Sequence, residues 1–202
     1  MAFRTLTLEQ FADALAARTP APGGGAVAAV TLAHASALGA MVLEFTLGKP
    51  AFSAHEGDNA AALRRLGELR HAALELADRD AEAYGALNAL WKLPKDAPAR
   101  QGPTWDAAVA EAIEAPQAIL EAAAEVASTC SGLAARTNPN LASDLAIAVD
   151  LARVAARAAA HNVAVNLPSV RDAAVRDARR ARMDAALAAA GAADGPSGTA
   201  HA

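Results

Sequence analysis

Asp80 is the side chain whose position in this sequence most needs a chemical explanation. It follows Leu76 by four residues and precedes Leu87 by seven, so it lies on the apolar stripe of a predicted helix. A carboxylate is costly to remove from water unless it has a partner or a task. Asp80 therefore either does chemistry or forms a structural ion pair with an arginine or lysine of another helix, and both interpretations remain open. Asp78 is expected to point to the opposite face.

A glycine-rich turn, Pro22-Gly23-Gly24-Gly25, precedes a long apolar segment. Three glycines before a helix leave backbone N–H groups bare and let a ligand approach closely, and the helix dipole favours negative charge there. The turn is neither a Walker A motif nor GxGxxG, and no predicted strand precedes it, so the usual nucleotide-binding folds are disfavoured. Ligand binding and a simple tight turn between helices are the two interpretations.

Polar residues mark both ends of a helix predicted from Leu141 to Asn166. Asp144 is in its first turn, where the helix dipole stabilises a carboxylate whatever its function. Asn162 lies on the same face, because the 18 positions from Asp144 to Asn162 make about five turns. Asn166 follows one turn later, and two asparagines on a face of small residues indicate hydrogen bonds to a ligand or to another helix. Three more polar residues gather near the start of this helix: Asn138, the candidate cap Asn140, and Ser143.

Lys49 follows the end of the long apolar segment. There it complements the negative end of a helix, and in a cleft it would hold a carboxylate. The histidines show no metal-ligand spacing, and Cys130 has no partner pattern for nucleophilic catalysis, so we expect no metal and no cofactor. His34 is expected to be a hydrogen-bonded core residue.

Helices must position these side chains. Hydrophobic residues make up 54% of the 202 residues, alanine dominates them, and aromatic residues account for only 3%. Alanine has the highest helix propensity, and no stretch alternates apolar with polar residues as a strand does. We therefore predict an all-α bundle of long antiparallel helices. It forms a single domain over 1–191, with 192–202 as a disordered tail rich in Gly, Pro, Ser and Ala.

The periodicity predicts six helices. The first is short, is opened by a Thr7–Gln10 capping box, and is followed by helices over about 26–47, 53–91, 105–133, 141–166 and 169–191. A Ser53–Glu56 capping box is predicted to open the third helix, and Pro116 to kink or break the fourth. The loop Leu93–Pro103 contains three prolines and a glycine.

The segment 26–47 has no lysine or arginine and would be about 33 Å long, enough to cross a membrane. It lacks flanking aromatic belts and contains His34, Ser36 and Glu44, so a buried core helix or an oligomer interface is favoured over a membrane span. A net charge of −4 argues against a nucleic-acid-binding surface. The single cysteine and the absence of an apolar h-region near the N-terminus make the cytoplasm the expected compartment.

Six pieces of the sequence, in this order, resemble the cyclodeaminase/cyclohydrolase family: the C-terminal domain of formiminotransferase-cyclodeaminase and its free-standing bacterial relatives. The similarity extends from about Leu8 to Asp172. The pieces are Ala21-Pro-Gly-Gly-Gly-Ala-Val-Ala-Ala, Met41-Val42 with Thr46-Leu-Gly-Lys49, Asp78-Arg-Asp-Ala-Glu-Ala-Tyr84, Leu93-Pro-Lys95, Asn138-Pro-Asn-Leu-Ala-Ser-Asp144 and Asn162-Val-Ala-Val-Asn-Leu167. Thr137-Asn138 stands where the family usually has Gly-Asn, and Pro50-Ala51 replaces polar residues that often follow the lysine.

The resemblance implies an all-helical, usually dimeric enzyme with a folate site at or near the subunit interface. It also implies one of two activities. A cyclohydrolase adds water to 5,10-methenyltetrahydrofolate and gives 10-formyltetrahydrofolate, whereas a cyclodeaminase closes 5-formiminotetrahydrofolate to the methenyl form and releases ammonia. A free-standing domain has no neighbouring formiminotransferase to supply the formimino substrate, which favours the cyclohydrolase. A non-catalytic helical scaffold is the alternative from another class.

On this interpretation Asp80 is the general acid or base, and Asp144 with Asn138 holds the pterin or the cation. Lys49 orients the substrate or binds its glutamate tail. The substrate is the folate itself, and the partner is a second copy of the chain. Further expected contacts come from the glycine turn and the neighbouring polar residues: Pro22, Gly23, Gly24, Gly25, Asn140, Ser143, Asn162 and Asn166. Together these groups are expected to line one folate cleft.

Overall fold

The computed structural model describes residues 2–192 and contains only helices within them. The α-helices are α1 (Leu8–Ala16), α2 (Gly24–Glu44), α3 (Glu56–Trp91), α4 (Pro103–Ser131), α5 (Ala142–Asn166) and α6 (Ala173–Ala192). Short 3-10 turns connect them: η1 (Phe3–Thr5), η2 (Pro50–His55), η3 (Pro98–Arg100), η4 (Pro139–Leu141) and η5 (Leu167–Ser169). The all-α prediction is confirmed. All but the first residue of the predicted tail 192–202 lies outside the described residues.

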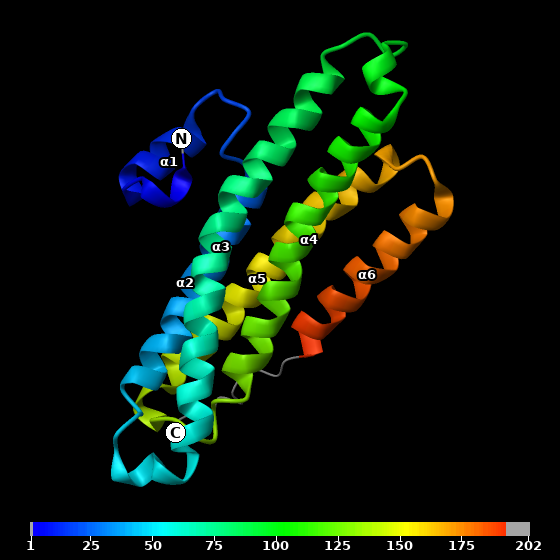
Figure 1. Ribbon diagram of the computed structural model, residues 1–202. Coiled ribbons are helices and arrows are strands. Elements are labelled where there is room, and N and C mark those ends of the chain that lie inside the picture. The colour runs from blue at the N-terminus through cyan, green and yellow to red at the C-terminus, as the bar shows by residue number, and fades with distance from the viewer. Residues whose placement is uncertain (1, 193–202) are drawn as a thin grey trace, which may run out of the picture.

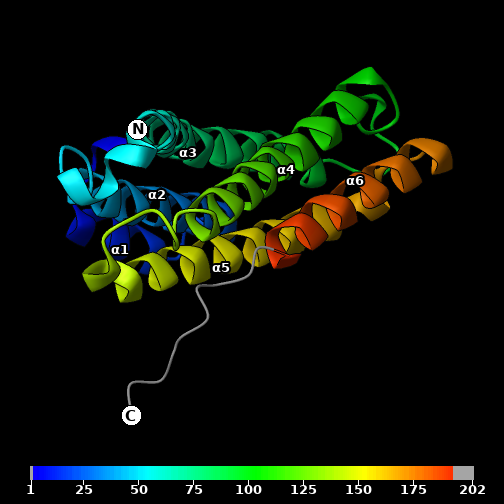
Figure 2. The same ribbon diagram turned by 90° about the horizontal axis from the view of Figure 1, so that it is seen from below.

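Four long helices form the core of the molecule. Helix α2 packs against α3 and α5, and α4 packs against the same two helices from the other side. Consecutive helices from α2 to α6 run in opposite directions, and α6 lies along the outside of α4 and α5, in the same direction as α4 (Figures 1 and 2). Helix α1 stands apart from the bundle (Figure 1) and buries none of its residues.

Helix α2 owes its central position to small side chains. Of its 21 residues 12 are buried, most of them alanine, glycine and leucine. At Gly39 the helix comes so close to α4 that an added Cβ would lie 2.6 Å from the Cys130 sulfur. The helix is long and apolar enough to cross a membrane. It is instead packed among α3, α4 and α5, as the core helix of a bundle is.

Several predicted boundaries are corrected by the structure. Helix α2 begins at Gly24, two residues earlier than predicted, and His34 on it is exposed, so the core position expected for it is wrong. The Ser53–Glu56 capping box is wrong: Pro50 opens a 3-10 turn in which the Ser53 hydroxyl donates to the Pro50 carbonyl, and α3 begins only at Glu56.

The structure also tests three further local predictions, two on helix caps and one on a proline. The Thr7–Gln10 capping box is confirmed, with both of its hydrogen bonds present. The predicted cap Asn140 is wrong, because Pro139 opens another 3-10 turn and α5 begins at Ala142. Helix α4 runs unbroken through Pro116.

Candidate functional site

A cavity of about 420 Å³ lies where the N-terminus of α2 meets α3, α4 and the C-terminal end of α5. Its volume falls in the usual range for small-molecule sites. Backbone, carboxylate, amide and aromatic groups all reach it. The lining residues are Pro20, Ala21, Gly23, Gly24, Gly25, Asp80, Ala81, Tyr84, Trp91, Ala112, Asn162, Val165 and Asn166.

Asp80 enters the cavity from α3 and rests directly against the backbone of Gly25. A Cβ added at Gly25 would overlap the carboxyl group of Asp80, so glycine at this position leaves the space that the carboxyl group occupies. Gly24 is less constrained, because its added Cβ would lie 3.6 Å from the amide nitrogen of Asn162. The third glycine of the turn therefore has a packing role that is tied to the carboxylate.

The Asp80 carboxylate has no hydrogen bond and no ion pair within residues 2–192. The structural ion pair considered for it is therefore absent from the described part of the chain. Burial raises the pKa of Asp80 to about 6. Asp80, which lies against the first turn of α2, is therefore placed to exchange a proton near neutral pH.

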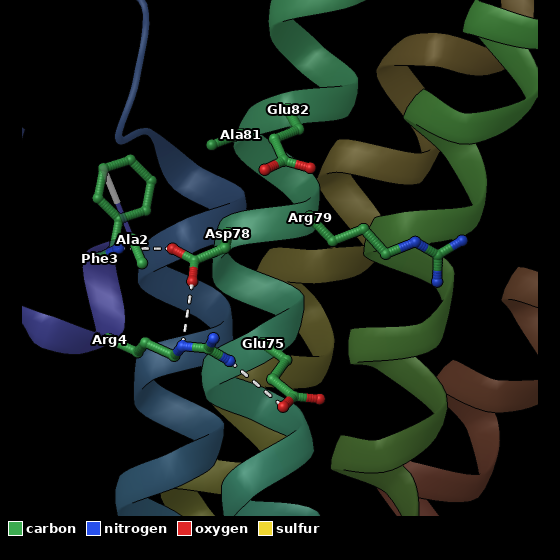
Figure 3. Close-up of a pocket in the computed structure, with 8 residues that line it drawn as sticks. All are labelled: Ala2, Phe3, Arg4, Glu75, Asp78, Arg79, Ala81 and Glu82. Atoms are coloured by element: carbon green, nitrogen blue, oxygen red, sulfur yellow. Dashed lines mark hydrogen bonds and ion pairs between the residues drawn. The ribbon is translucent and has the colours of Figure 1, made fainter.

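Asp78, two residues earlier, faces a different depression, between α3 and the N-terminal segment (Figure 3). Its carboxylate accepts a hydrogen bond from the Phe3 backbone N–H at 2.5 Å and lies 3.8 Å from the Arg4 guanidinium. Glu75, close by, pairs with the same arginine at 3.3 Å. The prediction that Asp78 and Asp80 face different sides of α3 is confirmed.

Two aromatic side chains form a wall of the cavity that the sequence interpretation missed. Tyr84 and Trp91 pack edge to face, with ring centroids 6.2 Å apart, and both remain partly exposed. They could have been found from spacing, since Tyr84 is one turn after Asp80 and Trp91 two turns after Tyr84. An aromatic wall of this kind suits a flat heterocycle.

Asn162 and Asn166 reach the cavity from α5, as their shared face predicted. The Asn162 amide nitrogen donates to the Ala158 carbonyl at 3.0 Å, within its own helix. Asn166 is 9% exposed and bonds across to α4. Pro22, in contrast, is buried and does not line the cavity.

The remaining predicted site residues lie at the other end of the bundle. The Asn138 backbone N–H donates to the Thr46 hydroxyl at 3.1 Å, just beyond the C-terminus of α2, and Lys49 follows three residues later. Helix α2 spans about 30 Å between this end and Gly25 (Figure 1). One chain therefore does not bring all the predicted groups into one folate cleft. The second group consists of Lys49, Asn138, Asn140, Ser143 and Asp144.

No group of three or more histidine, cysteine, aspartate or glutamate side chains in the described part of the chain is arranged to hold a metal ion. Cys130 is buried in the core, where burial raises the pKa of its thiol to about 12, and it does not line the cavity. The chemistry available in the cavity thus comes from one carboxylate, two amides, backbone groups and two aromatic rings.

Comparison with known proteins gives concordant results. The sequence profile described as formiminotransferase-cyclodeaminase matches residues 7–185. A methenyltetrahydrofolate cyclohydrolase of Methylorubrum extorquens is 33% identical, over 92% of this chain and 91% of its own length. The formimidoyltransferase-cyclodeaminase of Sus scrofa is also 33% identical, but the match spans only 34% of that protein. The crystal structure of a formiminotetrahydrofolate cyclodeaminase from Thermotoga maritima superposes with a TM-score of 0.85 at 29% identity, covering 93% of this chain and 91% of that one.

Proposed function

The chain belongs to the formiminotransferase-cyclodeaminase family, and on that basis we propose that it hydrolyses 5,10-methenyltetrahydrofolate to 10-formyltetrahydrofolate. The observation that carries the proposal is the half-buried carboxylate of Asp80, which has no partner among residues 2–192 and lies in a cavity with an aromatic wall. The cyclohydrolase from M. extorquens, which matches along nearly its whole length, supports this reaction. The folate is the substrate, and no separate cofactor is required.

The cyclodeaminase reaction is the second candidate. The T. maritima protein is named for it and, like this chain, is matched over nearly its whole length. A match along nearly the whole of a protein named for the deaminase weakens the preference for the cyclohydrolase that was based on the expectation of a free-standing domain. Both reactions act on the same bridge between N5 and N10 of the folate, and both need proton transfer at that place.

The hydrolysis suits a lone carboxylate. The methenyl group is part of a delocalised amidinium cation, which a carboxylate in a low-dielectric site attracts. Asp80 takes a proton from water as the water oxygen bonds to the methenyl carbon, which leaves a neutral adduct. When the adduct collapses, the bond from carbon to N5 breaks, N5 takes up a proton and the adduct hydroxyl loses its own. One proton leaves to solvent overall.

A second copy of the chain would bring the two ends of the bundle together. On α5, Ile147, Val154 and Val165 are 50%, 46% and 71% exposed, and Phe45 at the end of α2 is 57% exposed. The three α5 side chains are spaced by 7 and 11 residues and so share one apolar face of the helix, and Val165 also lines the cavity. Large exposed apolar faces mark association sites. In a two-fold dimer that packs antiparallel across this face, the Lys49 end of one chain adjoins the Asp80 end of the other.

Such a dimer would unite the predicted residues that one chain keeps apart. Lys49 would then orient the substrate or its glutamate tail, and Asp144 with Asn138 would face the pterin or the cation from the partner. We place this enzyme in the cytoplasm as a protein without nucleic-acid or membrane partners, in keeping with the burial of α2 and a net charge of −4.

The methenyl chromophore gives a direct test of the reaction. Purified protein should accelerate its loss and form 10-formyltetrahydrofolate. Appearance of the chromophore from 5-formiminotetrahydrofolate, with release of ammonia, would instead assign the cyclodeaminase. If the protein produces neither of these changes, both reactions are ruled out and the non-catalytic scaffold becomes the better interpretation.

Mixed variants test the shared site. Asp80→Asn and Lys49→Ala chains, each inactive alone, should regain part of the wild-type turnover when they are unfolded and refolded together, because one site of each mixed dimer has both wild-type residues. If the mixture stays as inactive as its components while a dimer forms, the two ends act separately.

A further inference from the structure

Asn166 is held in one orientation by two hydrogen bonds. Its amide nitrogen donates to the Ala112 carbonyl of α4 at 2.9 Å and to the Asn162 carbonyl of its own helix at 3.0 Å. Turning the amide over would set its oxygen against two carbonyl oxygens, so the network itself settles which atom is the nitrogen. Both N–H groups of the amide are therefore used within the protein.

Pro116 explains why the Ala112 carbonyl is free to accept. In an α-helix this carbonyl would receive the N–H of the residue four positions later, and that residue here is proline, which has none. Helix α4 nevertheless continues through Pro116, and Asn166 supplies the missing donor. The proline that suggested a kink thus sets the orientation of an amide on another helix.

Because both N–H groups of the Asn166 amide are used, only its oxygen, Oδ1, is available to a ligand, and it can only accept a hydrogen bond. Asn166 lines the cavity, and no donor within residues 2–192 reaches its Oδ1. Asp80, which lines the same cavity from α3, also has no donor within these residues. A ligand that fills the cavity must therefore bring N–H groups of its own, since an unpaired buried acceptor is costly.

We propose that Asn166 Oδ1 accepts a hydrogen bond from an N–H of the substrate's amino-pyrimidinone ring, and that Pro116 acts through Asn166 as a positioning residue. The inference rests on the proposed function, because the pterin of a folate carries such donors at N3 and at the 2-amino group. Binding this edge at Asn166 leaves Asp80 for the methenyl bridge. The site would then prefer heterocycles with an intact donor edge.

Pro116→Ala separates this role from a structural one. The new N–H of residue 116 would bond to the Ala112 carbonyl and release the Asn166 amide, while the helix gains propensity and a hydrogen bond. We expect KM for 5,10-methenyltetrahydrofolate to rise about five- to tenfold, the worth of one neutral hydrogen bond. The thermal midpoint should stay equal or rise, and kcat should change little. Pro103→Ala is the matched control, because Pro103 is the first residue of α4 and frees no such carbonyl.

Substrate analogues sharpen the test. The wild-type protein should discriminate by tenfold or more in kcat/KM against methenyl folates that lack the 2-amino group or carry a methyl group on N3. Asn166→Ala and Pro116→Ala should lose most of that discrimination, and Pro103→Ala should keep it. An active wild type whose Pro116→Ala variant keeps both its KM and its discrimination overturns this inference and leaves the proposed function standing. An inactive wild type overturns the proposed function itself.

Discussion

Asp78 and Asp80 are two residues apart on α3, and the molecule uses them in opposite ways. Asp78 holds the N-terminal segment through the Phe3 N–H and lies near Arg4, in a depression that also contains two other acidic groups and Arg79 (Figure 3). Asp80 has no such partner in the described part of the chain and lies against Gly25. The Asp78 carboxylate has its partners within the protein, whereas the Asp80 carboxylate is available to a ligand.

The difference shows which observation is informative about function. Both depressions are similar in size and both contain a carboxylate, so neither volume nor charge separates them. The two depressions differ in hydrogen bonding. Asp78 accepts a hydrogen bond from the Phe3 N–H, whereas Asp80 accepts none within residues 2–192, and polar groups away from water are normally paired. The Asp80 carboxylate and the Asn166 side chain both line one cavity, and substitutions at the two aspartates test the difference between them.

The largest effect is expected on turnover. Asp80→Asn should lower kcat by about 10²- to 10⁴-fold, the usual contribution of a general acid or base, with the fold intact by circular dichroism. Asp78→Asn, the control two residues away, should keep kcat within about twofold. Steady-state assays of the methenyl chromophore measure both. Equal losses in the two variants would remove the distinction on which the assignment of Asp80 rests.

The pH dependence of stability should separate the wild type from Asp80→Asn. The folded state holds the Asp80 proton more tightly than the unfolded chain, because burial raises its pKa from 3.8 to about 6. The stabilising contribution of the protonated form is therefore present below pH 4 and lost as the pH rises to about 6. The free energy of unfolding of the variant minus that of the wild type should grow over this interval by up to about 3 kcal/mol and stay constant above it.

Urea unfolding at several pH values measures this difference. Taking the difference removes the contributions of Glu111 and Glu121, whose pKa values are lowered by hydrogen bonds from Arg79 and Arg182 and which act with the opposite sign. A flat difference between pH 4 and 7 would contradict the buried environment of Asp80. In the assay, kcat that falls below pH 6 identifies Asp80 as the base, and kcat that falls above pH 6 identifies it as the acid.

The sequence predicted the fold well because its signals are local. The alanine-rich periodicity and the Thr7–Gln10 box depend on residues within one or two turns, and both were confirmed. The signals next to prolines failed: Pro50 and Pro139 open 3-10 turns that displace the helix starts and leave Ser53 and Asn140 without the capping roles predicted for them. A proline fixes its own φ angle and so competes with a cap placed within one turn of it.

The site could be predicted only in part, because it depends on distances between helices. Asp80 was found from the helical period, but its contact with Gly25 requires the close approach of α2 and α3. The separation of Lys49 from Asp80 could have been predicted, because the helix predicted over 26–47 is about 33 Å long and puts Lys49 at the end away from the glycine turn. Placing both residues in one cleft disregarded that length. The hydrogen bond from Asn166 to the Ala112 carbonyl, which Pro116 leaves free, joins residues 54 positions apart in sequence, and no local pattern indicates it.

A smaller effect is expected at Gly25, the glycine that faces Asp80. Gly25→Ala should lower the free energy of unfolding by about 1–3 kcal/mol, the cost of overpacking, because its Cβ would overlap the Asp80 carboxyl group. Gly24→Ala is the stability control, since its Cβ would meet Asn162 at an ordinary 3.6 Å and alanine favours the helix. Thermal and urea unfolding compare the two variants, and equal stability would show that Asp80 can move away from α2 without cost.

The smallest effect is expected at Asp78, and it tests the other side of the comparison. Asp78→Ala removes the acceptor of the Phe3 N–H and the negative charge that lies near Arg4, so the free energy of unfolding should fall by about 1 kcal/mol. Asp78→Asn keeps an acceptor and should lose only a few tenths of that, because the 3.8 Å ion pair involves a half-exposed arginine. Urea unfolding distinguishes the two. If both variants instead retain full stability, other contacts hold the N-terminal segment. Asp78 then contributes no more to the stability of the fold than Asp80 does.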